Sequence, residues 1–148
     1  MPRVLGLDVG TKRIGVALSD SLGMIASPFQ VLESKGLQAN ALMISRLGEA
    51  EEVEQYVVGM PYLMNGKIGG TGAQIELFAK QLETLVQKPV HRFDERWTTA
   101  IAERALREGN LSRKLRKEHR DAVAAAVILQ GWLDIERRKN RESSEDEE

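Results

Sequence analysis

Three acidic residues border or interrupt apolar segments, and carboxylates in such places are candidates for chemistry. Asp8 stands in an aliphatic stretch, Glu95 follows a short apolar run, and Asp121 precedes an alanine-rich one. Burying an ionised carboxylate costs roughly several kcal/mol of hydration unless a partner compensates for the charge. If the fold brings the three acids together, their charges repel one another, and a shared cation is the best compensation.

Each acid alone also has an ordinary structural explanation. Asp8 could accept hydrogen bonds from the backbone amides of the turn that follows it. Glu95 could pair with a neighbouring arginine, Arg92 or Arg96, and Asp121 could be a favourable charge in the first turn of a helix. These explanations stay open for each residue taken singly.

The spacing of the apolar residues predicts the elements that must position these acids. Residues 4–20 are typical of two short strands joined by a tight turn at 10–13. Pro28 indicates an edge position or a bulge for the third strand. Further strands are predicted at residues 24–32, 55–60 and 90–93, and helices at about 37–52, from near 73 to 88, at 98–108 and from about 121 onward.

The glycine-rich stretch at residues 62–72 is predicted to be a loop. It lacks the Gly-Lys-Ser/Thr ending of a P-loop. It is either a mobile surface connection or a loop whose amides face a phosphate at the start of the next helix.

Strands joined by short turns pair antiparallel, whereas strands separated by helices favour parallel pairing with right-handed crossovers. We therefore predict an α/β protein with a mixed five-stranded sheet, three antiparallel strands and then parallel ones, and helices on both faces. The first strand lies centrally beside the fourth, which places Asp8 near the carboxyl ends of strands four and five. Glu95 and Asp121 are expected at the same edge of the sheet.

Composition sets the limits of these predictions. The 148 residues are enough for one domain, expected at 1–140, and the polar, acidic segment 141–148 is expected to be a disordered tail. The absence of cysteine excludes disulfides, thiol catalysis and cysteine-ligated metals. No apolar run reaches the length of a membrane span and no secretory signal precedes the first strand, so we expect a cytoplasmic protein without a membrane partner. Residues 1–141 hold 21 bases and 17 acids, a balance that allows a nucleic-acid partner.

Four motifs in order resemble one family. They are Leu-Asp-Val-Gly-Thr-Lys-Arg-Ile-Gly-Val-Ala at 7–17, Val-Val-Gly-Met-Pro with a following Asn-Gly at 57–66, Asp-Glu-Arg-Trp-Thr-Thr at 94–99, and Asp121 with Ile-Leu-Gln-Gly-Trp-Leu at 128–133. This pattern resembles the bacterial candidate pre-16S rRNA nucleases, a family also described as Holliday junction resolvases. The resemblance implies an RNase H-like fold and a nuclease. Trp97 and Arg120 depart from the residues usual in the family, and Arg120 bears on the register of the last helix.

The resemblance implies that Asp8, Glu95 and Asp121 are the catalytic acids and form a divalent-metal site. Oxygen ligands without cysteine suit Mg²⁺ or Mn²⁺, which activate water and stabilise the leaving oxygen of a phosphodiester. Basic residues could then hold the nucleic-acid backbone, or they could simply be solvated. The candidates are Lys12, Arg13, Arg96, Arg113, Lys114, Arg116 and Lys117, the last four in a basic stretch at 112–120 that is expected to be a loop.

The sequence is compatible with several functions. The first is processing of the 5′ end of precursor 16S rRNA, and the second is resolution of branched DNA by the same chemistry. A non-catalytic nucleic-acid-binding protein is a third. Asp-Val-Gly-Thr also resembles the phosphate-binding hairpin of sugar kinases and Hsp70-like ATPases, but those proteins need two such domains around the nucleotide. The protein is expected to be a monomer or a homodimer, and a resolvase favours the dimer.

Overall fold

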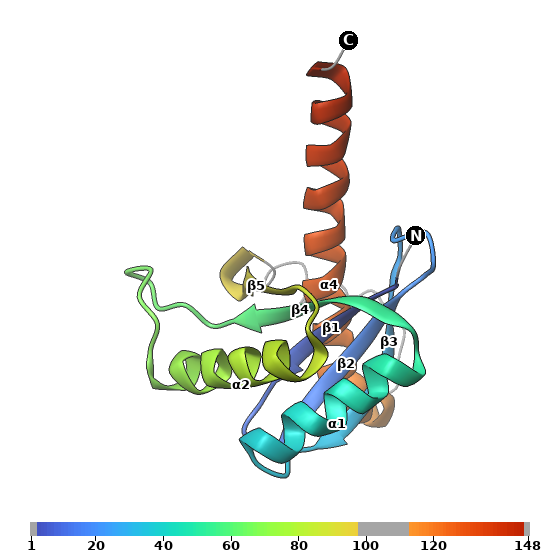
Figure 1. The fold of residues 1–148 in the computed structure, drawn as a ribbon. Helices are drawn as coiled ribbons and strands as arrows, with labels where there is room; N and C mark the ends of the chain where they lie inside the picture. Colours follow the sequence, from blue (N-terminus) through green and yellow to red (C-terminus); the bar gives the residue numbers. More distant parts are fainter. Residues whose placement is uncertain (1–2, 98–112, 147–148) are drawn as a thin grey trace.

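A computed structural model describes the backbone of residues 3–97 and 113–146, and the side chains of residues 3–97 and 120–143 (Figure 1). The helix predicted at 98–108 lies outside the described residues. Among the helices that the structure describes, none has the length and apolar character needed to cross a membrane.

The sheet has the predicted mixed architecture. Its strands lie in the order β3-β2-β1-β4-β5, with β1 in the centre. The pairs β1–β2 and β2–β3 are antiparallel, whereas β1–β4 and β4–β5 are parallel. The bounds are β1 Arg3–Val9, β2 Arg13–Ser19, β3 Ala26–Glu33, β4 Val53–Met60 and β5 Val90–Asp94.

Both explanations offered for Pro28 apply. The residue lies in β3, which is an edge strand, and it pairs with Ala17 where the register between β2 and β3 shifts after Val16. Proline has no amide hydrogen to donate to a ladder, so it is tolerated at an edge and at a bulge.

Helices cover both faces of the sheet, as predicted. In Figure 1, α1 (Leu37–Ala50) and α2 (Gly70–Val86) lie on one face and α4 (Arg113–Asp146) crosses the other. Alternation along the strands separates two cores. Leu5 and Leu7 of β1 pack toward α1 and α2, whereas Val4 packs with the alanines and leucines of α4. The face on which a β1 residue lies therefore follows from its position in this alternation.

Three helix boundaries differ from the predictions. α2 begins at Gly70 instead of near Ala73. α4 begins at Arg113 instead of about Asp121, so the stretch expected to be a basic loop is helical backbone. The same helix continues to Asp146, which corrects the expectation of disorder for residues 141–146. Arginine, lysine, leucine and glutamate are good helix formers, and no proline interrupts α4.

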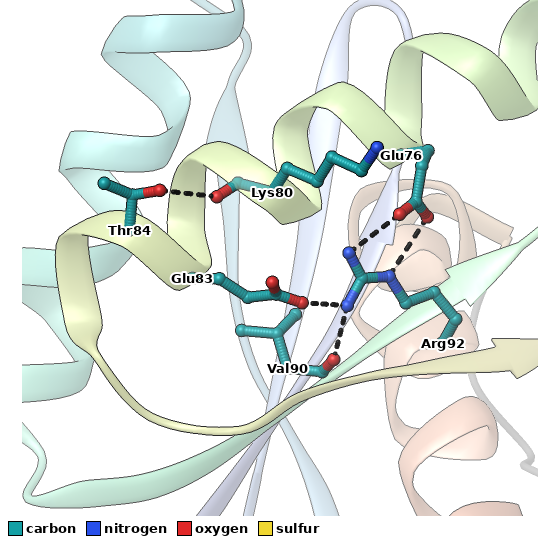
Figure 2. Close-up of polar contacts among 6 residues, drawn as sticks. All are labelled: Glu76, Lys80, Glu83, Thr84, Val90 and Arg92. Atoms are coloured by element: carbon teal, nitrogen blue, oxygen red, sulfur yellow. Dashed lines mark hydrogen bonds and ion pairs between the residues drawn. The ribbon is translucent and has the colours of Figure 1, made fainter.

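An arginine holds the edge strand β5 against α2 (Figure 2). Arg92 Nε and Nη2 donate to the two carboxylate oxygens of Glu76 at 3.0 and 2.8 Å. Arg92 Nη1 donates to Glu83, about two helical turns further along α2, and to the carbonyl of Val90 at 2.7 Å. This cluster fixes the strand from whose end Glu95 projects.

Candidate active site

Asp8 lies at the carboxyl end of the central strand. It alternates with Val4 and Gly6, both of which pack against α4, so its side chain lies on the α4 face of the sheet. Its neighbour in β2 is Gly15. The side chain is half-buried.

Two glycines in the strands leave the space that Asp121 and Glu95 occupy. A Cβ on Gly15 would overlap the backbone carbonyl of Asp121, so the glycine lets α4 approach β2 beside Asp8. A Cβ on Gly59 would lie 2.5 Å from Glu95 Oε1 and 2.6 Å from Ile128 Cδ1. Sequence analysis missed these roles, although a glycine inside a strand often marks the close approach of another group.

The three acids consequently lie over three neighbouring strands. Asp121 is above β2, Asp8 is on β1, and Glu95 is above β4 in the 3₁₀ turn Glu95–Trp97 that follows β5. All three are on the α4 face at the carboxyl ends of the parallel strands. This is the edge at which the topology was expected to bring them together.

Asp8 and Glu95 form the closest pair. The pKa of Glu95 is raised to about 7, first by burial, then by the charge of Asp8 and by a hydrogen bond with it. Burial also raises the pKa of Asp8, while the hydrogen bond with Glu95 opposes that rise and the charge of Asp121 adds to it. Below about pH 7, Glu95 is therefore the protonated member of the pair, and its carboxyl group donates a hydrogen bond to the Asp8 carboxylate.

Asp121 is engaged differently. Its Oδ2 accepts a hydrogen bond from Arg13 Nε of the hairpin turn at 2.8 Å. Within the described part of the chain, no three histidine, aspartate or glutamate side chains converge closely enough to hold a metal ion. Asp121 is thus near enough for its charge to raise the pKa of Asp8. In this conformation the Asp121 carboxylate forms an ion pair with Arg13.

The ordinary explanations fit this geometry less well. The guanidinium of Arg92 binds Glu76 and Glu83, and that of Arg96 binds Asp94. The amide of Gly10, in the turn after Asp8, donates to the carbonyl of Arg13 at 2.9 Å, so a backbone bond closes that turn. The Asp8–Glu95 contact, in contrast, is between two acids.

The donor set fits a divalent cation in part. Asp8 and Glu95 offer adjacent carboxylate oxygens, the ligands that Mg²⁺ and Mn²⁺ prefer. A cation there would offset the cost of burying the two carboxylates, which is the largest cause that raises the pKa of each. Asp121 could join as a ligand once Arg13 releases it.

The basic residues divide into three groups. Lys12 and Arg13 are exposed in the hairpin turn beside Asp8. Arg96 donates from Nη2 to Asp94 at 2.6 Å and from Nη1 to the carbonyl of Leu63 at 3.0 Å, so it ties the 62–69 loop to the end of β5. The hydrogen bond from the Arg96 side chain to Asp94 also lowers the pKa of Asp94. The backbone of residues 113–117 forms the start of α4, and the side chains of Arg113, Lys114, Arg116 and Lys117 lie outside the description.

Comparisons with known proteins agree with this architecture. The model of the RuvX family, described as Holliday junction resolvase, matches residues 2–135. A protein of Moorella thermoacetica, named as a candidate pre-16S rRNA nuclease, is 47% identical over 132 residues, which cover 89% of this chain and 94% of that protein. A relative of the same name from Bacillus thuringiensis is 46% identical over 135 residues, covering 89% and 98% of the two chains.

Two solved structures share the fold. The resolvase RuvC of T. thermophilus in complex with a Holliday junction substrate has a TM-score of 0.55 at 13% identity, covering 90% of this chain and 94% of that one. The Fowlpox virus resolvase in complex with Holliday junction DNA has a TM-score of 0.57 at 9% identity, covering 89% and 97%. These likenesses confirm the RNase H-like fold. Because the family model spans most of the chain and the two relatives are 46–47% identical to it, this chain belongs to the RuvX family, as the sequence motifs predicted.

Proposed function

We propose that this chain is a nuclease that hydrolyses phosphodiester bonds with Mg²⁺ or Mn²⁺ held by Asp8 and Glu95, and by Asp121 as a third ligand. The contact between the Asp8 and Glu95 carboxylates at the carboxyl edge of the sheet carries this proposal. Two acids forced together at an accessible edge make a poor structural pair but a good cation site. The names of the relatives point to the same class of reaction.

The cation supplies Lewis acidity toward the phosphate oxygens and lowers the pKa of the attacking water. Asp8 projects from a strand paired on both sides, so the backbone that carries its carboxylate is held by two neighbouring strands. Lys12, which is exposed in the turn that follows Asp8, can bind the phosphate next to the cleaved bond. Arg13 can do the same after leaving Asp121.

We propose precursor 16S rRNA as the substrate, cleaved near its 5′ end in the cytoplasm. The names of the relatives support this choice. A Holliday junction is the second candidate, supported by the description of the family model. A junction has two strands to cut symmetrically and favours a homodimer, whereas a single RNA end can be cut by a monomer.

The test compares both substrates under one set of conditions. Purified protein is incubated with a precursor 16S rRNA fragment or a four-way DNA junction, in Mg²⁺, Mn²⁺ or EDTA, while its oligomeric state is measured by light scattering. We expect metal-dependent cleavage of the RNA with 5′-phosphate products. Cleavage of the junction alone by a dimer would replace the first substrate by the second, and cleavage of neither substrate with either metal would refute the proposed nuclease activity.

A further inference from the structure

A cavity of about 530 Å³ opens on the other face of the sheet, at the same edge as the acids. It lies between the hairpin turn after β1 and the first residues of α1 and α2. Its volume is in the range of sites that hold small organic ligands. Neither the acids nor the basic residues of the proposed active site line it.

The lining suits an uncharged, flat group with polar edges. Leu37, Ile75 and Phe78 contribute apolar surface, and Thr11 and Gln74 contribute hydroxyl and amide groups that can donate and accept hydrogen bonds. No charged side chain is among the lining residues that the structure describes. An unpaired nucleobase has this chemistry, because proteins bind such bases on apolar or aromatic side chains and read their edges with hydrogen bonds.

The cavity is continuous in sequence with the proposed active site. Asp8 lies on the α4 face, the next residue Val9 packs toward α1 and α2 and lines the cavity, and Gly10 and Thr11 complete the turn between them. Gly10 is exposed and has no side chain. A nucleic-acid strand crossing this turn would reach the cavity on one side and the acids on the other.

The charge around the cavity also favours a nucleic acid. Both helices that begin at its rim lack a side-chain cap and lack acidic residues in the first turn. Their amino-terminal ends carry a partial positive charge, which attracts the phosphates that flank a bound base.

We propose that this cavity holds an unpaired nucleotide of the substrate strand, close to the phosphodiester that is cut. The base lies against the apolar wall and Gln74 binds its edge. This inference rests on the proposed nuclease function. A cavity of this kind makes the enzyme selective for substrates with an unpaired nucleotide beside the cleavage position.

Gly70 offers a way to fill the cavity without disturbing the fold. It lines the cavity, its φ angle is not positive, and a Cβ placed on it meets no heavy atom within 4 Å. Gly70→Val should therefore occupy the space that the base needs. Ala73→Val is the matched control, since Ala73 is exposed in the first turn of the same helix and does not line the cavity. Gln74→Leu keeps the size of the side chain and removes its hydrogen bonds.

Binding is measured in the Asp8→Asn background, so that cleavage cannot interfere. Fluorescence anisotropy gives Kd for a labelled single-stranded RNA and for the same sequence as a blunt duplex, after melting temperatures show that each variant is folded. We expect Gly70→Val to raise Kd for the single strand about five- to tenfold, as for the loss of one bound base. Gln74→Leu should raise it less, Ala73→Val should leave it unchanged, and all variants should bind the duplex equally.

Two results would overturn the inference. One is an equal Kd for the single strand in Gly70→Val and Ala73→Val, and the other is an equal loss of affinity for single strand and duplex. Because these measurements do not depend on turnover, they are separate from the test of the nuclease. The variants could show that the cavity does not bind a nucleotide while the wild-type protein still cleaves RNA. Equally, the cavity could bind a single strand as expected while no cleavage occurs.

Discussion

Glu95 makes the stability of the metal-free protein depend on pH. Its pKa rises from 4.5 to about 7 on folding, so the folded protein holds this proton more tightly than the unfolded chain. The stabilisation is fully present below the unfolded pKa of 4.5 and is lost as pH rises through about 7. Above that pH the Glu95 and Asp8 carboxylates are both ionised and repel each other.

Glu95→Gln should therefore stabilise the protein at high pH and leave it unchanged at low pH. Glutamine keeps the shape of the protonated acid and can donate to Asp8, but it never ionises. In EDTA at about pH 8 we expect a gain of about 1–2 kcal/mol, reduced from the full effect because solvent partly reaches the group. Urea unfolding at about pH 4 and pH 8 measures the difference. A variant no more stable than wild type at the higher pH would show that the acids are not in contact.

Arg13 competes with a cation for Asp121. Removing the guanidinium by Arg13→Gln should free the Asp121 carboxylate and tighten Mn²⁺ binding by up to about fivefold, the range expected for a largely exposed ion pair. Lys12→Gln is the control, since Lys12 is also exposed and lies in the same turn. Calorimetric titration with Mn²⁺ compares the two. If both variants bind Mn²⁺ as wild type does, Asp121 is not a ligand.

At the scale of elements, the Arg92 cluster joins β5 to α2 (Figure 2). The arginine side chain is only 21% exposed and balances both Glu76 and Glu83. Arg92→Met should cost about 1–3 kcal/mol, because it leaves two acids without a cation in a half-buried place. Arg137→Met is the control, as its pair with Asp134 is exposed within one helix and should cost less than about 0.5 kcal/mol. If urea unfolding gave equal losses of unfolding free energy for Arg92→Met and Arg137→Met, the Arg92 cluster would contribute no more to stability than an exposed ion pair.

The strands were predictable from sequence and the ends of the helices were not. Alternation in β1 and β2 showed where Asp8 stands, and the order of strands and helices placed Glu95 at the same edge. The start of α4 was missed because a run of charged residues indicates solvent exposure, whether the backbone is loop or helix. The pairing of Arg13 with Asp121 spans 108 residues, so it depends on how closely α4 approaches Gly15. No local pattern encodes that distance.

At the scale of the whole molecule, the carboxyl-terminal part of α4 extends away from the sheet (Figure 1). Residues 137–143 are exposed, and five of the last seven residues are acidic. Deleting residues 141–148 should leave the melting temperature unchanged and should not weaken nucleic-acid binding, since acids repel phosphates. Thermal melting and anisotropy measure both properties. A loss of more than about 1 kcal/mol would show that this end packs on the body.

The most direct test of the central claim combines metal binding, stability and cleavage in Asp8→Asn. If Asp8 holds a cation for phosphodiester hydrolysis, the variant should remain folded, with a melting temperature in EDTA equal to or above that of wild type, because a buried charge is removed. Mg²⁺ or Mn²⁺ should raise the melting temperature of wild type and not that of the variant, and cleavage of the precursor rRNA fragment should disappear. Metal-dependent cleavage by Asp8→Asn at the rate of wild type would contradict the account.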